Sequence, residues 1–259
     1  MNFHIGGMNH TPSAYKRPGP NAADLAKMYI KEWDNLLLKM KQGYPPKEIL
    51  PTIYFSRKIG TGALMIADLL GEKIGYRVVD REILDLIARS ADHKKETVSA
   101  TDECNPKKSR GNGDGFHGED SFIESDYIKH LFSGVLALAS LGPTIFVGRG
   151  VHFILPRDRV LSVRFLSSKN HRVRNIAGAL NVHEEDAEGA LDQIDREQKR
   201  FFNKVYGKIS APPEEFDLVI NCDQIPDPGN CAELVAQAFR FKFGDEAATR
   251  FADKKHKKT

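Results

Sequence analysis

The feature that most constrains the fold is a glycine turn between a short apolar run and an amphipathic helix. Thr52 to Ser56 is rich in β-forming residues, and Gly60 and Gly62 lead into an apolar-periodic helix over Ala63 to Lys73. A second buried strand, Tyr76 to Asp80, ends in a carboxylate. Strand, helix and strand in this order predict a βαβ unit, in which the strands run parallel and the crossover is right-handed.

The same alternation continues along the rest of the chain. Further strand candidates are Thr144 to Val147, Val160 to Leu166 and Asp217 to Ile220. Apolar residues at helical spacing predict helices near 24–40, 82–90, 127–138 and 233–243, and a long helical stretch between the last two strands. Asn181 and Glu184 form a capping-box signature within that stretch. Strands alternating with helices predict a three-layer α/β domain.

Local composition suggests how the chain is organised. Residues 1–20 carry Gly, Pro, Asn and Ser without periodicity and predict a flexible arm, and residues 21–50 predict an amphipathic helix and a linker. Residues 51–245 carry the α/β pattern. Within them, residues 92–120 are polar and glycine-rich and predict a mobile loop or insertion. Residues 246–259 form a basic tail, which we expect to be solvated.

Composition and charge exclude several classes of protein. A chain of 259 residues with 41% hydrophobic and 28% charged residues is typical of soluble globular proteins. No run of about 18 apolar residues and no secretory signal occur, which predicts a cytoplasmic protein without a membrane partner. The net charge of +3 is too small to favour a nucleic acid partner. Three cysteines without CxxC spacing and scattered histidines predict neither disulfides nor a metal site.

The glycine turn is of a kind that binds phosphate, because exposed backbone N–H groups and a helix N-terminus together attract an anion. It departs from the standard P-loop, which has a lysine and a hydroxyl residue after its second glycine. This chain has Ala63 and Leu64 there. A plain tight turn is one alternative. A dinucleotide-binding turn is another, because Asp80 lies where a ribose-binding acid would be, although Met65 replaces the third glycine.

Cationic residues further along the chain favour phosphoryl transfer, in which catalysis consists mostly of positioning and charge neutralisation. Arg149 stands between two glycines directly after a strand, at the edge where parallel sheets bind ligands. A second group consists of Arg172, Arg174, Arg196, Lys199, Arg200 and Lys204. Within it, Arg196 and Arg200 share one helix face. For each of these residues a solvated surface position is the alternative.

Five motifs spaced along the chain combine these features. They are Ile53-Tyr54-Phe55-Ser56-Arg57 leading to Gly60-Thr61-Gly62, Val79-Asp80-Arg81-Glu82-Ile83-Leu84, Phe146-Val147-Gly148-Arg149-Gly150, Asp195-Arg196-Glu197, and Phe216-Asp217-Leu218-Val219-Ile220-Asn221. In this order they resemble the cytidylate kinase-like family, from about Thr52 to Phe239. The resemblance implies a P-loop-type nucleoside monophosphate kinase fold with a central five-stranded parallel sheet and a helical lid bearing arginines. It also implies ATP and Mg²⁺ as cofactors and a nucleoside monophosphate, CMP or dCMP, as substrate.

The resemblance assigns roles to the matching positions. It implies a donor-phosphate loop made of Lys58, Gly60, Thr61, Gly62, Ala63 and Leu64. It implies that Asp80, Arg81 and Arg149 bind the acceptor, with Asp80 on the monophosphate side or near the metal. The implied catalytic cations are Arg57, Arg149, Arg172, Arg196 and Arg200. Arg57 is expected to supply the charge of the missing P-loop lysine.

Departures from the family pattern leave the activity open. Lys58 replaces the usual acid after the first arginine, Ala63 stands at a glycine or lysine position, and Gln198 stands where relatives often have arginine. Losing one such cation can lower the rate about a hundredfold. A nucleotide-binding regulatory protein without turnover is therefore an alternative to the kinase. A dinucleotide-dependent oxidoreductase and nucleic-acid binding through the basic tail are weaker ones. The N-terminal helix is expected either to pack on the main domain or to form a homodimer contact.

Overall fold

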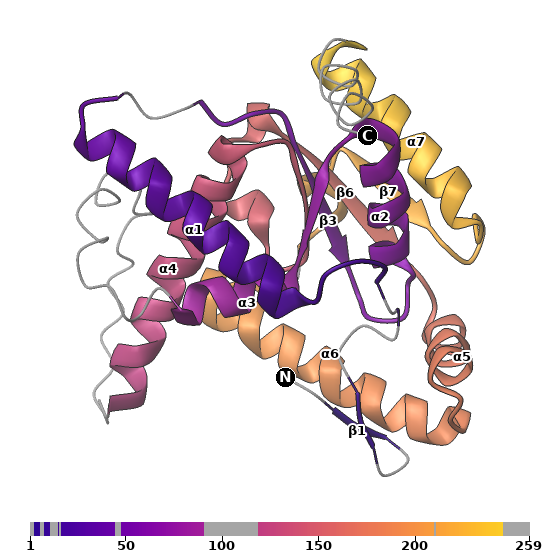
Figure 1. Cartoon of the computed structure of the whole chain (residues 1–259). Helices are drawn as coiled ribbons and strands as arrows, with labels where there is room; N and C mark the ends of the chain where they lie inside the picture. The colour runs from indigo at the N-terminus through magenta and orange to yellow at the C-terminus, as the bar shows by residue number, and fades with distance from the viewer. Residues whose placement is uncertain are drawn as a thin grey trace. The chain divides into compact units, whose positions relative to one another are not determined.

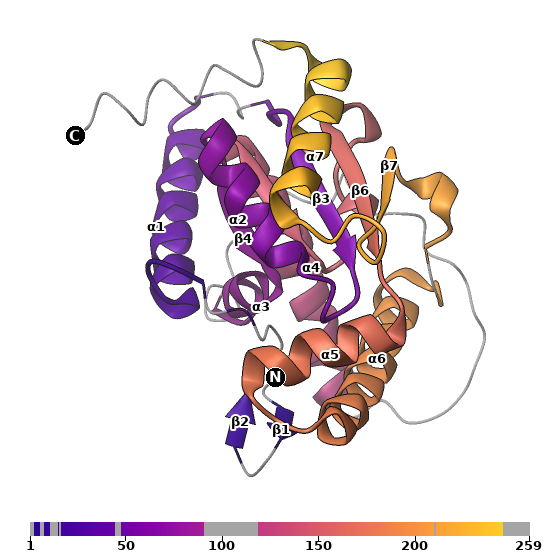
Figure 2. The same cartoon turned by 90° about the vertical axis from the view of Figure 1, so that its right-hand side faces the viewer.

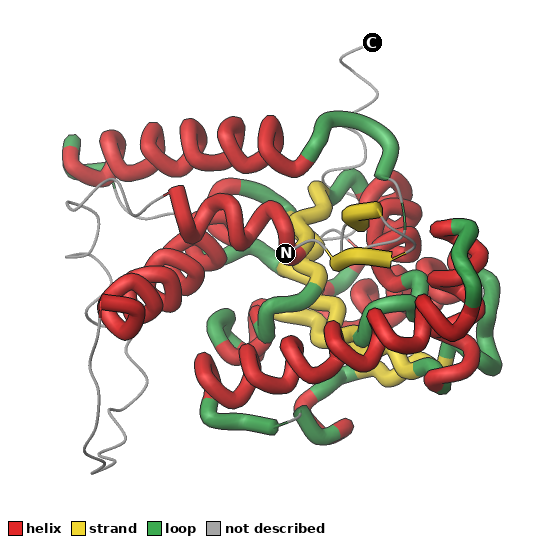
Figure 3. Tube along the Cα trace, turned by 90° about the horizontal axis from the view of Figure 1, so that it is seen from below, coloured by secondary structure: helices red, strands yellow, loops and turns green. Residues whose placement is uncertain are grey.

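The computed structural model describes residues 3–5, 8–10, 15, 17–44, 48–90, 119–209 and 211–245. The chain folds into two compact units. Unit 1 comprises residues 1–19, 48–81 and 142–259, and unit 2 comprises residues 20–47 and 82–141. These units do not coincide with the ranges expected from composition, because the helices after the second strand of the sheet fall into unit 2 together with the N-terminal helix. Figure 3 shows the helices and strands of the described chain by colour.

Unit 1 is built on a parallel sheet. Its strands are β3 (Thr52–Arg57), β4 (Arg77–Asp80), β5 (Thr144–Val147), β6 (Val160–Leu166) and β7 (Leu218–Asn221). They lie in the order β4-β5-β3-β6-β7, and every neighbouring pair is parallel. Figure 1 labels β3, β6 and β7 of this sheet. The predicted α/β class with a five-stranded parallel sheet is confirmed. In the central strand β3 every residue from Thr52 to Ser56 is buried, as is typical of a parallel strand covered on both faces.

Two helices of unit 1 cover one face of this sheet. Helix α2 (Ala63–Ile74) and helix α7 (Pro228–Phe243) pack against each other and against the strands. Figure 2 shows them side by side in front of β3 and β6. Their apolar faces meet the side chains of Ile53, Phe55 and Val163 in one buried cluster. This packing fixes where β3 ends and where α2 begins.

Helix α5 (Lys169–Leu180) and helix α6 (Glu184–Tyr206) follow β6 and form a helical pair. The predicted capping box is wrong. Asn181 has φ 53° and caps the C-terminus of α5, and α6 begins after His183, whose side chain makes no cap hydrogen bond. Asparagine tolerates the left-handed conformation that ends a helix, and here this preference outweighs its tendency to begin one.

The N-terminal segment of unit 1 is not a free arm throughout. Strands β1 (Phe3–Ile5) and β2 (Met8–His10) pair antiparallel, and β1 lies against α6. Arg17 donates hydrogen bonds to both carboxylate oxygens of Asp68 in α2, over 2.7 to 3.1 Å. Arg17 is thus tied to α2, whereas the flexible arm expected for residues 1–20 stays a prediction.

Unit 2 contains three described helices: α1 (Ala22–Lys41), α3 (Arg81–Ser90) and α4 (Glu119–Leu141). Helix α1 begins as its pattern predicts, because Asn21 Oδ1 accepts a hydrogen bond from the Asp24 amide at 2.9 Å. Tyr127 donates to Asp85 at 2.8 Å and ties α4 to α3. The homodimer contact expected on α1 stays a prediction.

Two predictions fall largely or wholly outside the described residues. Of the expected insertion 92–120, only the last two residues are described, as the start of α4, and the basic tail 246–259 is not described. Within the described part of the chain, no helix combines the length and the apolar character needed to cross a membrane.

Candidate active site

The loop between β3 and α2 has the backbone that the glycine turn predicts. Gly60 has φ +85° and Gly62 has φ +76°, both in the left-handed region that favours glycine. Gly62 is the N-cap of α2 and offers no side chain to its first N–H groups. The first N–H groups of a helix have no partner within the helix and carry partial positive charge. The turn therefore ends at a helix N-terminus whose amides are available to an anion.

Gly60 is required for a second reason, which is close packing. A Cβ atom at this position would lie 2.8 Å from the backbone oxygen of Arg172 and 2.9 Å from its Cβ. Helix α5 therefore rests directly on the loop. In contrast, a Cβ at Gly62 would have no heavy atom within 4 Å.

Side chains of α5 and α6 hold the backbone carbonyls of the loop. Arg172 donates to the Ile59 oxygen at 3.2 Å, and Asn175 donates to the Gly60 oxygen at 2.9 Å. Gln198 donates to the Arg57 oxygen at 3.0 Å. Because these carbonyls accept hydrogen bonds from α5 and α6, the two helices hold the loop in its conformation, although they lie far from it in the sequence.

An ion pair anchors this arrangement. Arg172 donates to both oxygens of Asp195 at 3.0 and 2.8 Å, and its side chain is only 3% exposed. Lys58 donates to the same carboxylate at 3.1 Å. Burial alone would raise the pKa of Asp195, but the hydrogen bonds from Arg172 and Lys58 outweigh it and lower this pKa below its usual value. Asp195 is thus the anionic centre of the contact between loop and helices.

The contacts of Arg172 differ from those expected of a lid cation. A lid cation must be able to approach a transferring phosphoryl group, whereas the guanidinium of Arg172 is buried and held at two points by Asp195. Arg172 therefore shapes the loop. Arg196 and Arg200, two further arginines expected to act on the phosphoryl group, are exposed on α6.

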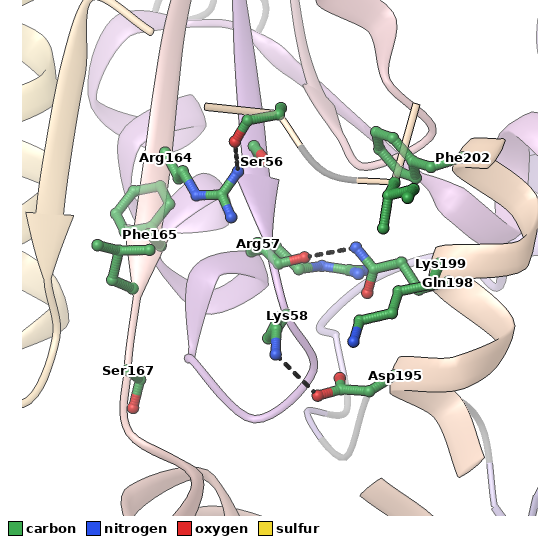
Figure 4. Close-up of a pocket in the computed structure, with 13 residues that line it drawn as sticks. Ser56, Arg57, Lys58, Arg164, Phe165, Ser167, Asp195, Gln198, Lys199 and Phe202 are labelled. Atoms are coloured by element: carbon green, nitrogen blue, oxygen red, sulfur yellow. Dashed lines mark hydrogen bonds and ion pairs between the residues drawn. The ribbon is translucent and has the colours of Figure 1, made fainter. Parts of the chain in front are cut away.

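A cavity of about 290 Å³ joins the end of β3 to α6 (Figure 4). Its cationic side chains come from Arg57, Lys58, Arg164 and Lys199, against the single acid Asp195. The remaining wall is formed by Ser56, Phe165, Leu166, Ser167, Gln198, Phe202, Ile209 and Ala211. Figure 4 shows the Lys58–Asp195 and Gln198–Arg57 contacts across this space. The cavity thus presents excess positive charge beside the start of the loop.

A group of arginines gathers at the carboxyl ends of β3, β4 and β5. Burial, and then the neighbouring charges of Arg81 and Arg149, lower the pKa of Arg57 to about 10, whereas Asp80 acts in the opposite direction. The guanidinium nitrogens of Arg57 would lie 3.8 to 3.9 Å from a Cβ placed on Gly148. The structure therefore brings Arg57, Asp80, Arg81 and Arg149 together. Such a group attracts an anion at the edge where parallel sheets bind ligands.

The strained turn around Arg149 is held by aromatic side chains. Arg149 itself has φ 59°, which is uncommon for a residue with a side chain. Its guanidinium carbon lies 4.0 Å from the centre of the Phe201 ring, and Tyr206 donates to its backbone oxygen at 2.5 Å. A Cβ at Gly150 would lie 2.5 Å from the Tyr206 ring, so this position requires glycine. Helix α6 therefore fixes the orientation of Arg149.

The sequence model of the cytidylate kinase-like family matches residues 52–224, which span all five strands of the sheet. The chain belongs to the cytidylate kinase-like family. No curated protein matches the sequence.

Solved structures that match this cytidylate kinase-like protein include one that resembles it in fold. The crystal structure of an uncharacterised protein from Eubacterium ventriosum ATCC 27560 shares 16% identity at a TM-score of 0.56, over 74% of this chain and 98% of that one. A shikimate kinase from Bacteroides thetaiotaomicron is 13% identical, with a TM-score of 0.36 over 72% and 96% of the two chains. The shikimate kinase from Acinetobacter baumannii in complex with shikimate is 16% identical, with a TM-score of 0.40 over 73% and 93%.

The loop of the cytidylate kinase-like chain fits the phosphates of a nucleotide better than it fits a metal ion. Its glycines and the uncapped start of α2 suit phosphate oxygens. The side chains that follow, Ala63 and Leu64, cannot bind a cation, and Thr61 donates its hydroxyl to the Lys58 oxygen at 3.0 Å. Among the described residues, no group of three or more His, Cys, Asp or Glu side chains could hold a metal ion.

Several residues of this site were not predicted to act there. Gln198 was expected only as a missing arginine, but it donates a hydrogen bond to the loop. Lys199 was named in the second cationic group, and it lines the cavity. Asp195 was part of a recognised motif, which was the only available signal for it. Arg164 belongs to a predicted strand, and alternation alone could not indicate that it reaches the cavity. Arg17 lay in a segment without any pattern.

Proposed function

We propose that the protein transfers a phosphoryl group from ATP to a nucleoside monophosphate, with CMP or dCMP as the acceptor. Membership of the cytidylate kinase-like family supports phosphoryl transfer between nucleotides. The observation that carries the proposal is the left-handed pair Gly60 and Gly62, which opens an uncapped helix at the end of the central strand. The choice of CMP or dCMP follows the family alone.

The donor phosphates would bind along the backbone from Lys58 to Leu64. Amide groups would donate to their oxygens, and Gly60 would keep the turn narrow against α5. When bound, Mg²⁺ neutralises part of the charge of the donor phosphates. It would be held mainly by phosphate oxygens, because the first turn of α2 supplies no hydroxyl; Asp80 is the candidate carboxylate near it.

The acceptor phosphate would bind among the arginines at the ends of β3, β4 and β5. Arg57 and Arg149 would donate to its oxygens, and Arg81 would add to the positive potential. Lys58 and Lys199, which line the cavity next to the loop, would stabilise the charge that spreads over the transferring group. In this proposal Arg172 positions the loop, and Arg196 and Arg200 remain outer cations of α6.

A second candidate function is nucleotide binding without turnover. This function is favoured because the two groups that could replace the standard P-loop side chains are already hydrogen-bonded within the protein. Lys58 donates to Asp195, and the Thr61 hydroxyl donates to the Lys58 oxygen. A protein that binds ATP or CMP and serves as a regulatory module would keep the loop and the arginine group but produce no ADP.

The two functions are separated by binding and product measurements on the whole chain. Thermal shifts with ATP, CMP, dCMP, UMP, AMP and NAD, each with and without Mg²⁺, identify the ligands, since a ligand of the folded state raises Tm. Chromatography of a mixture with ATP and the best acceptor then detects ADP and the nucleoside diphosphate. Both products in equal amounts support the kinase, and binding without products supports the second candidate. Stabilisation by NAD alone, or by no nucleotide, overturns both.

A variant pair tests the loop itself. In Gly62→Val, the left-handed backbone is disfavoured although space is available, so ATP affinity should fall while the fold persists. Gly178→Ala is the matched control, because this helical glycine has open space around it. Equal ATP affinity in Gly62→Val and the parent protein would contradict the proposed donor site.

A further inference from the structure

Arg17 lies in the segment that precedes the family match at residues 52–224, yet it reaches the edge of the sheet. Its Nε and Nη2 groups donate to the Asp68 carboxylate over 2.7 to 3.1 Å, and Nη2 also lies 3.4 Å from the Val78 oxygen. Its Nη1 lies 3.7 Å from Oδ2 of Asp80, the last residue of β4. One guanidinium therefore links α2, the backbone of β4 and the acid at its end.

The three charged side chains are shielded from water. Arg17 is 21% exposed, Asp68 is 15% exposed and Asp80 is 13% exposed. Water and salt weaken interactions between partly buried charges less than those on the open surface. A planar guanidinium is suited to two acids at once, because it donates from several nitrogens in fixed directions. Arg17 can thus hold Asp68 through one edge and attract Asp80 through its other nitrogen.

The charge of Asp80 matters because of what surrounds it. Asp80 is the acid that favours the charged form of Arg57, while Arg81 and Arg149 disfavour it. A phosphate approaching this group would be attracted by the arginines and repelled by the carboxylate. A cation on the far side of the carboxylate reduces that repulsion without occupying the position of the phosphate.

We propose that Arg17 is a positioning residue of the acceptor site, which holds the Asp80 carboxylate at the end of β4 and offsets its charge beside the bound phosphate. The inference rests on the proposed function, in which the acceptor phosphate binds beside Arg57 and Arg149. It makes the N-terminal segment part of the site. The competing explanation is that Arg17 has a structural role alone and attaches this segment to α2 through its ion pair with Asp68.

Variants of Arg17 and Tyr15 separate the two explanations. Arg17→Ala should weaken CMP binding about tenfold by calorimetry and raise the CMP KM equally, with the Kd and KM for ATP within about twofold of the parent values. Arg17→Lys keeps one positive charge and should recover part of the loss. Tyr15→Phe is the matched control, because Tyr15 hydrogen-bonds to Asp68 from the same segment. It should lower Tm but leave CMP affinity within about twofold.

The outcomes distinguish this inference from the proposed function. If Arg17→Ala lowers Tm and binds CMP as tightly as the parent chain, Arg17 is only a fastening and the inference is wrong, while the kinase proposal stands. If Arg17→Ala does not fold, the CMP affinity of Arg17→Lys becomes the test. Unchanged CMP affinity in both Arg17→Lys and Tyr15→Phe would then also reject the inference. If the parent chain binds neither CMP nor ATP, both proposals are rejected.

Discussion

Arg172 and Asp195 face each other across the contact between α5 and α6, with Nη1–Oδ1 and Nη2–Oδ2 distances of 3.0 and 2.8 Å. The same guanidinium donates to the loop at Ile59, and the same carboxylate accepts from Lys58. One buried ion pair therefore sets both the packing of the helical pair and the conformation of the loop.

Replacing Arg172 should lower the free energy of unfolding of the protein. Arg172→Ala leaves Asp195 partly buried without its main partner, and breaking such a pair from one side costs about 3–5 kcal/mol. Urea titration monitored by circular dichroism measures the loss. Arg174→Ala is the control, because Arg174 is exposed on the same helix, and it should change the free energy of unfolding by less than about 0.5 kcal/mol. Equal stability of the two variants would contradict the anchoring role.

Two glycine substitutions should have opposite effects on stability. Gly60→Ala adds a Cβ that meets the Arg172 backbone at 2.8 Å and strains a backbone with φ +85°. The strain alone costs about 1–3 kcal/mol. Gly178→Ala places its Cβ in open space inside α5 and should stabilise the helix by about 0.5–1 kcal/mol. Thermal unfolding of both variants measures the difference, and a Gly60→Ala protein as stable as the parent would show that α5 does not rest on the loop.

Stability should fall at low pH through Asp223. Hydrogen bonds from Ser167 and Ser168 lower the pKa of Asp223 to about 2, which lies below its value of about 3.9 in the unfolded chain. The contribution is complete above about pH 5 and is lost as the pH falls toward 2. Melting temperatures between pH 2 and 6 should therefore decline less steeply for Asp223→Asn. Ser167→Ala removes a donor and raises the pKa of Asp223 toward its unfolded value, so the decline should be smaller and end at a higher pH. Unchanged profiles in both variants would contradict this account.

Arg57 should be needed for binding of the acceptor. Arg57→Gln removes a cation that burial and two neighbouring arginines already disfavour, and a charged hydrogen bond to phosphate is worth about 1.5–3 kcal/mol. The CMP Kd should rise about tenfold or more by calorimetry. Arg159→Gln is the control, because Arg159 is distant from the loop in sequence and lies within ion-pair distance of Glu48 and Asp158. Unchanged CMP affinity in Arg57→Gln would remove Arg57 from the site.

Lys199 should contribute to turnover rather than to folding. It is exposed and lines the cavity next to the loop, so Lys199→Ala should lower kcat about tenfold or more without changing Tm. Arg174→Ala serves again as the control with unchanged kcat. Initial rates of ADP formation at saturating ATP and CMP measure the effect, and equal kcat in Lys199→Ala and the parent would assign the cavity charge no role in transfer.

Local patterns in the sequence determined the elements and their class. Strand β5 and strand β6 begin and end at the predicted residues, and the turn at Gly60 and Gly62 has the left-handed backbone that glycine permits. These features depend on neighbours within a few residues, so periodicity and turn chemistry suffice to predict them. The sequence likewise placed Arg149 directly after a strand, at the edge of the sheet where parallel strands end.

The tertiary structure decided which charged residues are available to a ligand. Arg172 and Asp195 are 23 positions apart, and Arg17 and Asp68 are 51 apart. No periodicity connects residues at such separations, and a charged side chain in a sequence shows neither its partner nor its burial. Asn181 is a similar case, since it can begin one helix or end another, and the packing of α5 against α6 selected the second. The sequence by itself thus determined the elements and the loop, whereas the fold determined the charge pairing, because pairing depends on distances in space.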